Sequence, residues 1–317
     1  MNQPSLTRYA WLSISAAVVT IGLKLAAYLF TGSVGLLSDA IESLVNLIGA
    51  VVALVMLTIA AQPPDEEHAY GHSKAEYFSS GVEGTLIVIA AISIAVAAGE
   101  RLMAPQPIED VGLGLTISVV ASLINLVVAR ILLRVGRQHS SIALEADGRH
   151  LMTDVWTSVG VVLGVAAVAI TGWLRLDAII ALLVAANIIR EGWWLLKRTI
   201  SGLMDAALSV DEQSAVRGVL AKYEQEGIQF HAMRTRQAGA RRFVSIHVLV
   251  PGNWTVQRGH QTLERLEADV RQVLSNVTVF THLEPLGDAA SWQDTALDRS
   301  DSILNEPAGN QNTEASQ

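Results

Sequence analysis

Six long apolar runs dominate this sequence and restrict what it can fold into. Each has about 20 residues, the length a helix needs to cross a hydrocarbon layer of roughly 30 Å. The runs are Trp11–Phe30, Val34–Ala61, Gly84–Leu102, Leu113–Val135, His150–Leu174 and Ala178–Leu196. Hydrophobic residues make up 51% of the chain and charged residues only 16%, as expected for a protein embedded in a lipid bilayer. The sequence therefore predicts an α-helical, multi-pass membrane protein.

Composition narrows the chemistry that this chain can perform. Cysteine is absent, so disulfides and thiolate metal sites are excluded, and any metal must bind to histidine, carboxylate, amide or water. The formal net charge of −8 argues against a nucleic-acid partner. The first apolar run is too long for a cleavable signal peptide and has no Ala-x-Ala cleavage pattern, so we expect it to remain as the first span.

Lysine and arginine are concentrated at the span ends that would lie on one side of the membrane. Basic residues precede the first span, lie between the second and third, and follow the fourth and sixth: Arg8, Lys74, Arg134, Arg137, Lys197 and Arg198. Cytoplasmic loops of membrane proteins are enriched in these residues. The pattern predicts that both chain termini are cytoplasmic.

Two of the apolar runs contain ionisable residues at matched spacing. The stretches beginning at Asp39 and Asp147 both read Asp-x-x-ligand-x-x-x-ligand, with ligand positions Glu42 and Asn46, and His150 and Asp154. Residues four apart share one helix face, and ionisable groups inside a membrane are costly unless they serve a function. Four donors are the number that a tetrahedral divalent metal takes. Polar contacts between helices are the alternative, but the matched spacing favours a metal site.

The donor types indicate which ions such a site would take. Imidazole and carboxylate suit Zn²⁺ and its neighbours Co²⁺, Cd²⁺, Fe²⁺, Ni²⁺ and, less well, Mn²⁺. Both groups bind metal only when deprotonated, so metal binding and proton release are linked. The residues thus provide a physical basis for exchanging metal for protons. Asp39 and Asp147 are either supporting or proton-path groups, or simply helix-end charges.

A polar segment between the second and third spans offers a further candidate site. Asp65, His68 and His72 have a spacing that lets them converge on a metal. The alternative is a solvated polar loop. Lys74 follows nearby, and we expect it to form a salt bridge with Asp205 at the junction between membrane and cytoplasm.

The pattern changes after Ile200 to that of a small soluble domain. We expect two helices and three strands in the order α-β-β-α-β, at Val210–Glu226, Ile228–Arg236, Arg242–Val250, Thr255–Leu274 and Val277–Glu284. Asp211 is the candidate N-cap of the first helix, and Gln237–Ala240 is the turn between the first two strands. The sequence thus predicts a transport domain at 1–206, a cytoplasmic domain at 207–287 and a disordered tail at 288–317.

Four of the eight histidines fall in this soluble domain. They are placed on strands and one helix, at His231, His247, His260 and His282. Residues on one face of a sheet can converge, so we predict a metal-binding cluster. Ordinary surface or core histidines are the alternative.

Four motifs together give the chain a family resemblance. They are Ser38-Asp-Ala-Ile-Glu-Ser-Leu-Val-Asn, His68-Ala-Tyr-Gly-His-Ser-Lys-Ala-Glu, Ala146-Asp-Gly-Arg-His-Leu-Met-Thr-Asp and Arg234-Thr-Arg-Gln-Ala-Gly. From about Tyr9 to Pro285 the sequence resembles the cation diffusion facilitator family, in particular its bacterial zinc/iron efflux branch.

This resemblance implies a homodimer with six spans per subunit and a metallochaperone-like cytoplasmic domain. It implies proton-coupled export of divalent metal by alternating access. The family's transport site corresponds to Glu42, Asn46, His150 and Asp154, and its loop site to Asp65, His68 and His72. Its cytoplasmic site corresponds to His231, His247, His260, His282 and Glu284, and Lys74 with Asp205 matches a dimer-stabilising charge pair.

Three positions depart from the family pattern. The first transport pair is Glu42 and Asn46, where close relatives have two aspartates, and Glu284 stands where an aspartate is usual. The neutral Asn46 weakens the Coulomb attraction for a dication and removes a titratable group.

Three other functions compete with a Zn²⁺-type metal/proton antiporter. A membrane-bound metalloenzyme would need more histidines than the membrane spans provide. A non-transporting partner that regulates or scaffolds another transporter is compatible with Asn46. A passive channel would conduct metal without proton coupling.

Overall fold

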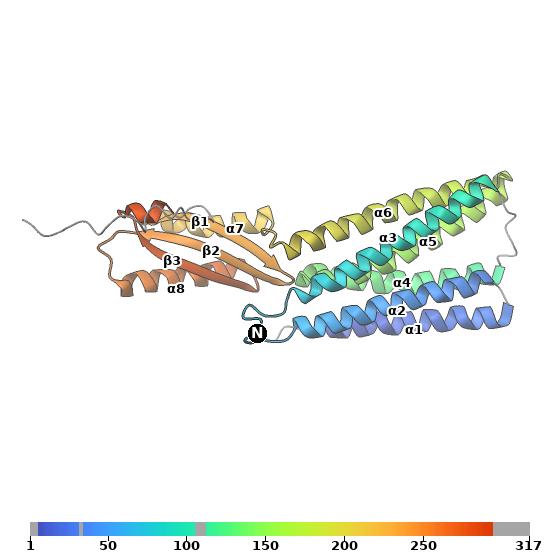
Figure 1. Cartoon of the computed structure of the whole chain (residues 1–317), viewed down its shortest axis with the longest axis horizontal. Helices are drawn as coiled ribbons and strands as arrows, with labels where there is room; N and C mark the ends of the chain where they lie inside the picture. Colours follow the sequence, from blue (N-terminus) through green and yellow to red (C-terminus); the bar gives the residue numbers. More distant parts are fainter. Residues whose placement is uncertain (1–5, 32–33, 105–111, 294–317) are drawn as a thin grey trace, which may run out of the picture. The chain divides into compact units, whose positions relative to one another are not determined.

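The computed structural model describes residues 6–31, 34–104 and 112–293 of the chain. Within these ranges the side chains of some helical residues, including Asp39, Glu42 and Asn46, lie outside the description. The chain forms two compact units: the first comprises Met1–Asp205 with Ala238–Ala240, and the second comprises Ala206–Gln237 with Arg241–Gln317 (Figure 1).

The first unit consists of long helices that match the predicted spans. They are α1 (Thr7–Thr31), α2 (Val34–Ala60), α3 (Ala75–Met103), α4 (Gly112–His139), α5 (Ile142–Thr171) and α6 (Arg175–Leu203). This confirms the helical transmembrane fold predicted from the apolar runs. α3 packs most extensively against α6, α4 against α5, and α1 against α2.

Two helices begin well before their apolar runs. α3 begins at Ala75 and α5 at Ile142, about two turns ahead of the predicted starts at Gly84 and His150. The polar residues at these ends are buried against protein: the Ser141 hydroxyl donates to the carboxylate of Glu76 and accepts from the backbone amide of Leu144. The prediction placed these ends too late because apolar length marks contact with lipid and not the extent of the helix.

Glycines allow α3 and α6 to approach closely. A β-carbon at Gly192 would lie 2.7 Å from Cγ2 of Val88, and one at Gly84 would lie 3.0 Å from Cδ2 of Leu196. Small residues at helix contacts are characteristic of membrane bundles, in which van der Waals packing drives association.

The outer surface of the first unit is apolar. Large hydrophobic side chains point outward along its helices, among them Leu29, Ile170, Leu183 and Trp193. A soluble monomer rarely exposes so much apolar surface, whereas a lipid bilayer covers it at no cost. Among the described residues, four stretches are long and apolar enough to cross a membrane: Thr7–Ala26, Ala75–Met103, Val119–His139 and Ala178–Leu203.

The second unit has the predicted α-β-β-α-β order. It contains α7 (Val210–Glu224), β1 (Gln229–Ala238), β2 (Arg241–Val250), α8 (Val256–Val273) and β3 (Val277–Pro285). The sheet order is β1-β2-β3; a two-residue turn joins β1 to β2, and β2 pairs in parallel with β3 through the crossover helix α8. The N-cap of α7 is Ser209 and not the predicted Asp211, because Ser209 and Glu212 exchange hydrogen bonds as a capping box.

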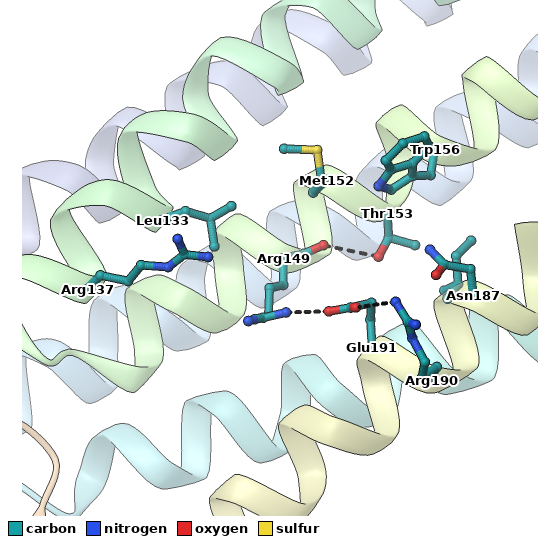
Figure 2. Close-up of a pocket in the computed structure, with 10 residues that line it drawn as sticks. Leu133, Arg137, Arg149, Met152, Thr153, Trp156, Asn187, Arg190 and Glu191 are labelled. Carbon is teal, nitrogen blue, oxygen red and sulfur yellow. Dashed lines mark hydrogen bonds and ion pairs between the residues drawn. The ribbon is translucent and has the colours of Figure 1, made fainter. Parts of the chain in front are cut away.

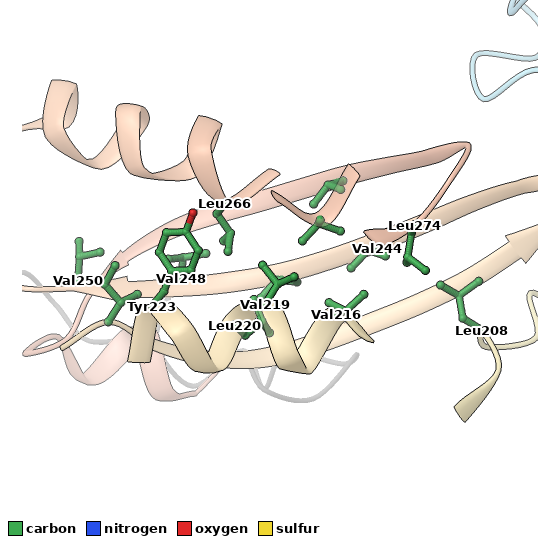
Figure 3. Close-up of a cluster of buried hydrophobic side chains, with 14 residues drawn as sticks. Leu208, Val216, Val219, Leu220, Tyr223, Val244, Val248, Val250, Leu266 and Leu274 are labelled. Atoms are coloured by element: carbon green, nitrogen blue, oxygen red, sulfur yellow. The ribbon is translucent and has the colours of Figure 1, made fainter. Parts of the chain in front are cut away.

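The helices of this unit share a hydrophobic core with the sheet (Figure 3). Alternate residues of β2 enter this core, namely Val244, Ile246, Val248 and Val250. They pack with Val216, Leu220, Leu266 and Val270 of the two helices. Because side chains alternate along a strand, the residues between them point to the opposite face of the sheet.

The chain continues beyond β3 as a short 3₁₀ helix, η1 (Ala289–Trp292), whose N-cap is Asp288. This segment falls within the tail that we predicted to be disordered. Residues 294–317 lie outside the described part of the chain.

Candidate metal sites

α5 presents two predicted ligands on one face. The stretch Glu145–Asp154 is entirely helical, so His150 and Asp154 lie one turn apart. His150 is buried and Asp154 is half-buried. Both side chains therefore lie inside the helical unit and not on its lipid-facing surface.

A carboxylate from α3 contacts this pair, and the sequence analysis missed it. Oε2 of Glu83 lies 3.4 Å from Nδ1 of His150, and the Glu83 side chain is 1% exposed. Glu83 directly precedes the apolar run predicted to begin at Gly84, so its charge would have been read as lying at a helix end. Because α3 begins two turns earlier, Glu83 is instead in the interior of the unit.

Neighbouring helices hold the acidic groups of α5. The Ser13 hydroxyl of α1 donates to Oδ1 of Asp147 at 3.0 Å, and the Asn125 amide of α4 donates to Oδ2 of Asp154 at 3.3 Å. Asp147 is thus a buried group and not a charge at the end of a helix. Asn125 carries no charge and lies in an apolar run, so the sequence offered no signal for its role.

The other two predicted ligands are on α2. The side chains of Glu42 and Asn46 lie outside the described residues, but the backbone at both positions is helical. Positions 42, 46 and 49 share one helix face by their spacing. At Gly49 that face meets Glu83 directly, since a β-carbon there would lie 2.5 Å from Oε1 of Glu83.

A pocket of about 280 Å³ lies beside α5 but on a different face (Figure 2). Its α5 lining residues are Arg149, Met152, Thr153 and Trp156. Arg149 pairs there with Glu191 of α6. Since His150 and Asp154 do not line this pocket, it is distinct from the predicted transport site.

The polar segment between α2 and α3 brings its three predicted ligands together. Ligand atoms of Asp65, His68 and His72 all lie within 4.8 Å of one another. Oδ2 of Asp65 is 3.2 Å from Nε2 of His72, and Oδ1 is 3.3 Å from Nδ1 of His68. The hydrogen bond from the His68 backbone amide lowers the pKa of Asp65, and both imidazoles add to this effect. The carboxylate is therefore kept in its ligating form.

The predicted ion pair at the end of the helical unit is present. Nζ of Lys74 lies 2.9 Å from Oδ1 of Asp205, and it also donates to the carbonyl of Leu203 at 3.3 Å. The pair thus joins the start of α3 to the end of α6.

The second unit gathers histidines on the sheet face opposite its helical core. His247 of β2 is the register partner of His282 of β3. Oε2 of Glu284 is 2.8 Å from Nε2 of His231, and Oε1 is 3.4 Å from both Nδ1 of His247 and Nε2 of His282. Three of these residues, His231, His247 and Glu284, have ligand atoms within 4.8 Å of one another.

An irregularity in β1 brings His231 into this group. Ala232 has a positive φ of 49°, which interrupts the alternation of the strand. Phe230 and Met233, on either side of His231 and Ala232, both pack against the helical core. His231 is left on the opposite face, beside Glu284.

His260 differs from the other predicted cytoplasmic ligands. It is exposed on α8, which packs on the other side of the sheet. Within the described part of the chain it is not among the residues whose ligand atoms cluster.

The fold and these sites define a class of protein, a polytopic membrane transporter of metal cations. Family models agree: residues 10–204 match the cation efflux transmembrane domain, and residues 208–286 match the cytoplasmic domain of cation efflux proteins. The chain belongs to the cation diffusion facilitator, or cation efflux, family. It is therefore a cation efflux transporter that carries divalent metal and not an enzyme, which removes the metalloenzyme alternative.

Named relatives are similar over most of their length. A Synechocystis protein described as uncharacterized transporter sll1263 is 53% identical over 285 residues, covering 90% of this chain and 92% of the relative. The cation-efflux pump FieF of Shewanella oneidensis is 28% identical over 274 residues, covering 86% and 92%. FieF of Serratia proteamaculans is 29% identical over 286 residues, covering 88% and 94%.

Proposed function

We propose that this protein is a divalent metal/proton antiporter that exports Zn²⁺ or a near neighbour from the cytoplasm. The observation that carries the proposal is the placement of His150 and Asp154 one turn apart inside the helical unit. Glu42 and Asn46 on α2 complete the proposed transport site. Metal binds from the cytoplasm, the site turns outward, and protons displace the metal.

The donor chemistry supports coupling between metal and protons. Imidazole and carboxylate bind a dication only after losing their protons, so each metal bound is accompanied by proton release. Zn²⁺ fits this donor set, and Fe²⁺, Cd²⁺, Co²⁺, Ni²⁺ and Mn²⁺ are the other candidates.

The two remaining clusters have supporting roles in this proposal. The group at Asp65, His68 and His72 binds metal near the cytoplasmic entrance. The group at His231, His247, His282 and Glu284 senses cytoplasmic metal and biases the arrangement of the helices, with His260 as a further candidate ligand.

We infer that the protein works as a homodimer in a bacterial cytoplasmic membrane, with both termini in the cytoplasm. The family of the second unit and the Lys74–Asp205 ion pair support the dimer. The bacterial sources of the relatives and the distribution of lysine and arginine support the location.

Proton flux from proteoliposomes of the purified protein tests this function. Wild type, His150→Ala, Asp154→Ala and the control His139→Ala are each given one metal at a time. We expect wild type and His139→Ala to move protons with Zn²⁺ or a neighbour, and the two site variants to lose at least about tenfold of that flux. Wild-type flux in both site variants would contradict the site.

The same experiment distinguishes the remaining alternatives. A wild-type protein that moves no protons with any metal, but regains flux on Asn46→Asp, would be a regulatory or scaffold member of the family. Metal uptake measured in the same proteoliposomes that occurs without proton movement would indicate a channel.

A further inference from the structure

We propose that the carboxylate of Glu83 is a ligand for the transported cation, together with His150 and Asp154, and that it sets the preference among metals. This inference rests on the proposed function of the α5 site. Glu83 belongs to α3, a helix that contributed no ligand to the site predicted from the sequence.

The burial of Glu83 is the first observation that points to a cation. Its side chain is 1% exposed, and neither carboxylate oxygen accepts a hydrogen bond in the described part of the chain. A buried carboxylate without hydrogen bonds is strongly unfavourable unless a positive charge compensates it. A bound dication would supply that charge.

The surroundings of Glu83 distinguish it from the other buried acids nearby. Asp147 accepts a hydrogen bond from Ser13, and Asp154 accepts one from Asn125. Glu83 accepts no such hydrogen bond within the described part of the chain, and its ion-pair contact is the 3.4 Å one with Nδ1 of His150. Of these three described acids, it is the one with both oxygens left without a hydrogen bond.

The position of Glu83 between two helices is the second observation. On one side it contacts His150 of α5, and on the other it lies against Gly49 of α2. Position 49 shares a helix face with the predicted ligand positions 42 and 46. The carboxylate thus lies between the two helices whose ligand pairs are proposed to form the site.

A third carboxylate changes the chemistry of that site. The four predicted ligands comprise one imidazole, one amide and two carboxylates, and Glu83 makes the set richer in charged oxygen. Mn²⁺ favours oxygen ligands, whereas imidazole suits Zn²⁺. Glu83 should therefore strengthen binding of Mn²⁺ more than binding of Zn²⁺.

A purely orienting role is the alternative, in which Glu83 holds the His150 ring by its Nδ1 atom. Carboxylates commonly orient metal-binding histidines in this way. Loss of an orienting group weakens all metals by a similar factor, whereas loss of a ligand changes their order of preference.

The test measures metal binding to full-length protein in a background of Asp65→Ala with His231→Ala, which weakens the loop and cytoplasmic clusters. In this background we compare Glu83→Gln, Gly49→Ala and the control Glu100→Gln, which removes an exposed charge from the same helix. Competition between Mn²⁺ and Zn²⁺ is followed by the metal content of the purified protein. Thermal midpoint and gel-filtration profile report folding.

We expect Glu83→Gln to weaken Mn²⁺ binding by about 10–100-fold and Zn²⁺ binding by less than about tenfold, with Glu100→Gln unchanged. Gly49→Ala should shift the preference in the same direction, because its new methyl group displaces only the flexible end of the Glu83 side chain. It also provides the readout if Glu83→Gln does not fold.

Two outcomes would overturn the inference: affinities in both variants within about twofold of the background, or a uniform loss across metals. Adding His150→Ala to the background distinguishes a failure of the inference about Glu83 from a failure of the proposed function. If that variant binds metal normally and transports it in proteoliposomes, the α5 site itself is wrong. If it loses binding while Glu83→Gln does not, only the role of Glu83 is wrong.

Discussion

Nδ1 of His150 on α5 lies 3.4 Å from Oε2 of Glu83 on α3, and both side chains are almost fully buried. The contact brings an acidic residue from a third helix to the site predicted on α2 and α5. A membrane interior makes such a pair costly unless it serves a function.

Asn125→Ala should weaken metal binding at the α5 site by about tenfold. The Asn125 amide donates to Oδ2 of Asp154 at 3.3 Å, so its loss frees the carboxylate to rotate away from the direction of the metal. The KM for metal-dependent proton flux in proteoliposomes measures the change. Asn187→Ala is the matched control, because Asn187 lines the pocket on a different face of α5. Equal losses in the two variants would show that Asn125 has no specific role.

The helical fold could be predicted from the sequence because apolar length and charge placement are local signals. The order of the elements in the second unit followed equally from strand and helix periodicity. The helix starts at Ala75 and Ile142 could not be predicted, because burial of Glu76 and Ser141 depends on contacts between distant segments. The sequence shows the N-cap of α7 as a Ser-x-x-Glu pattern from Ser209 to Glu212, but the prediction placed the cap two residues later, at Asp211.

The candidate sites were predictable where ligands share one element or a regular register. Asp65, His68 and His72 come together within one short segment, and His247 and His282 are register partners. Glu83 was missed because its place at the edge of an apolar run gave no sign that it is buried. His260 was grouped with the other histidines by composition, although α8 holds it on the other side of the sheet.

Reversing the charge of Lys74 or Asp205 alone should lower stability, and reversing both should restore it. The two charges are 2.9 Å apart, but each side chain is more than one-third exposed, so the pair contributes no more than about 1 kcal/mol. Thermal midpoints of Lys74→Asp, Asp205→Lys and the double variant measure this, with the dimer fraction followed by gel filtration. A double variant as unstable as the sum of the single variants would show that the pair contributes nothing.

Glu212→Gln should destabilise the first turn of α7 at neutral pH and have no effect at pH values below the folded-state pKa of Glu212. Burial alone would raise the pKa of Glu212, but hydrogen bonds from Arg242 and Ser209 outweigh it, and the net pKa is lowered. Because the folded-state pKa is lowered, the ionised group stabilises the fold fully at pH values above the pKa of Glu in the unfolded chain, which is about 4.3. That contribution is lost as the pH falls through the folded pKa.

Hydrogen exchange of the α7 amides in the full-length chain checks this pH dependence. At pH 7 we expect Glu212→Gln to reduce protection by about 0.3–1 kcal/mol, the value of a negative charge at a helix N-terminus, because Gln keeps an oxygen that can accept the capping hydrogen bond. As the pH falls through the lowered folded-state pKa of Glu212 the two proteins should converge, because wild type then also loses its carboxylate. Glu224→Gln, which changes an exposed residue of the same helix, should match wild type at every pH. A difference that grows on acidification would refute the assignment.

Zn²⁺ should stabilise the second unit through His231, His247 and Glu284 but not through His260. Ligand atoms of the first three residues lie within 4.8 Å of one another, whereas His260 is exposed on α8. A metal that binds only the folded state raises the free energy of unfolding by about 2.7 kcal/mol when its concentration is 100 times its dissociation constant. Hydrogen exchange of β2 and β3 amides, with and without Zn²⁺, measures this gain in the full-length protein. We expect His231→Ala to lose most of the gain and His260→Ala to keep it; the reverse order would place the cytoplasmic metal on α8 instead of the sheet.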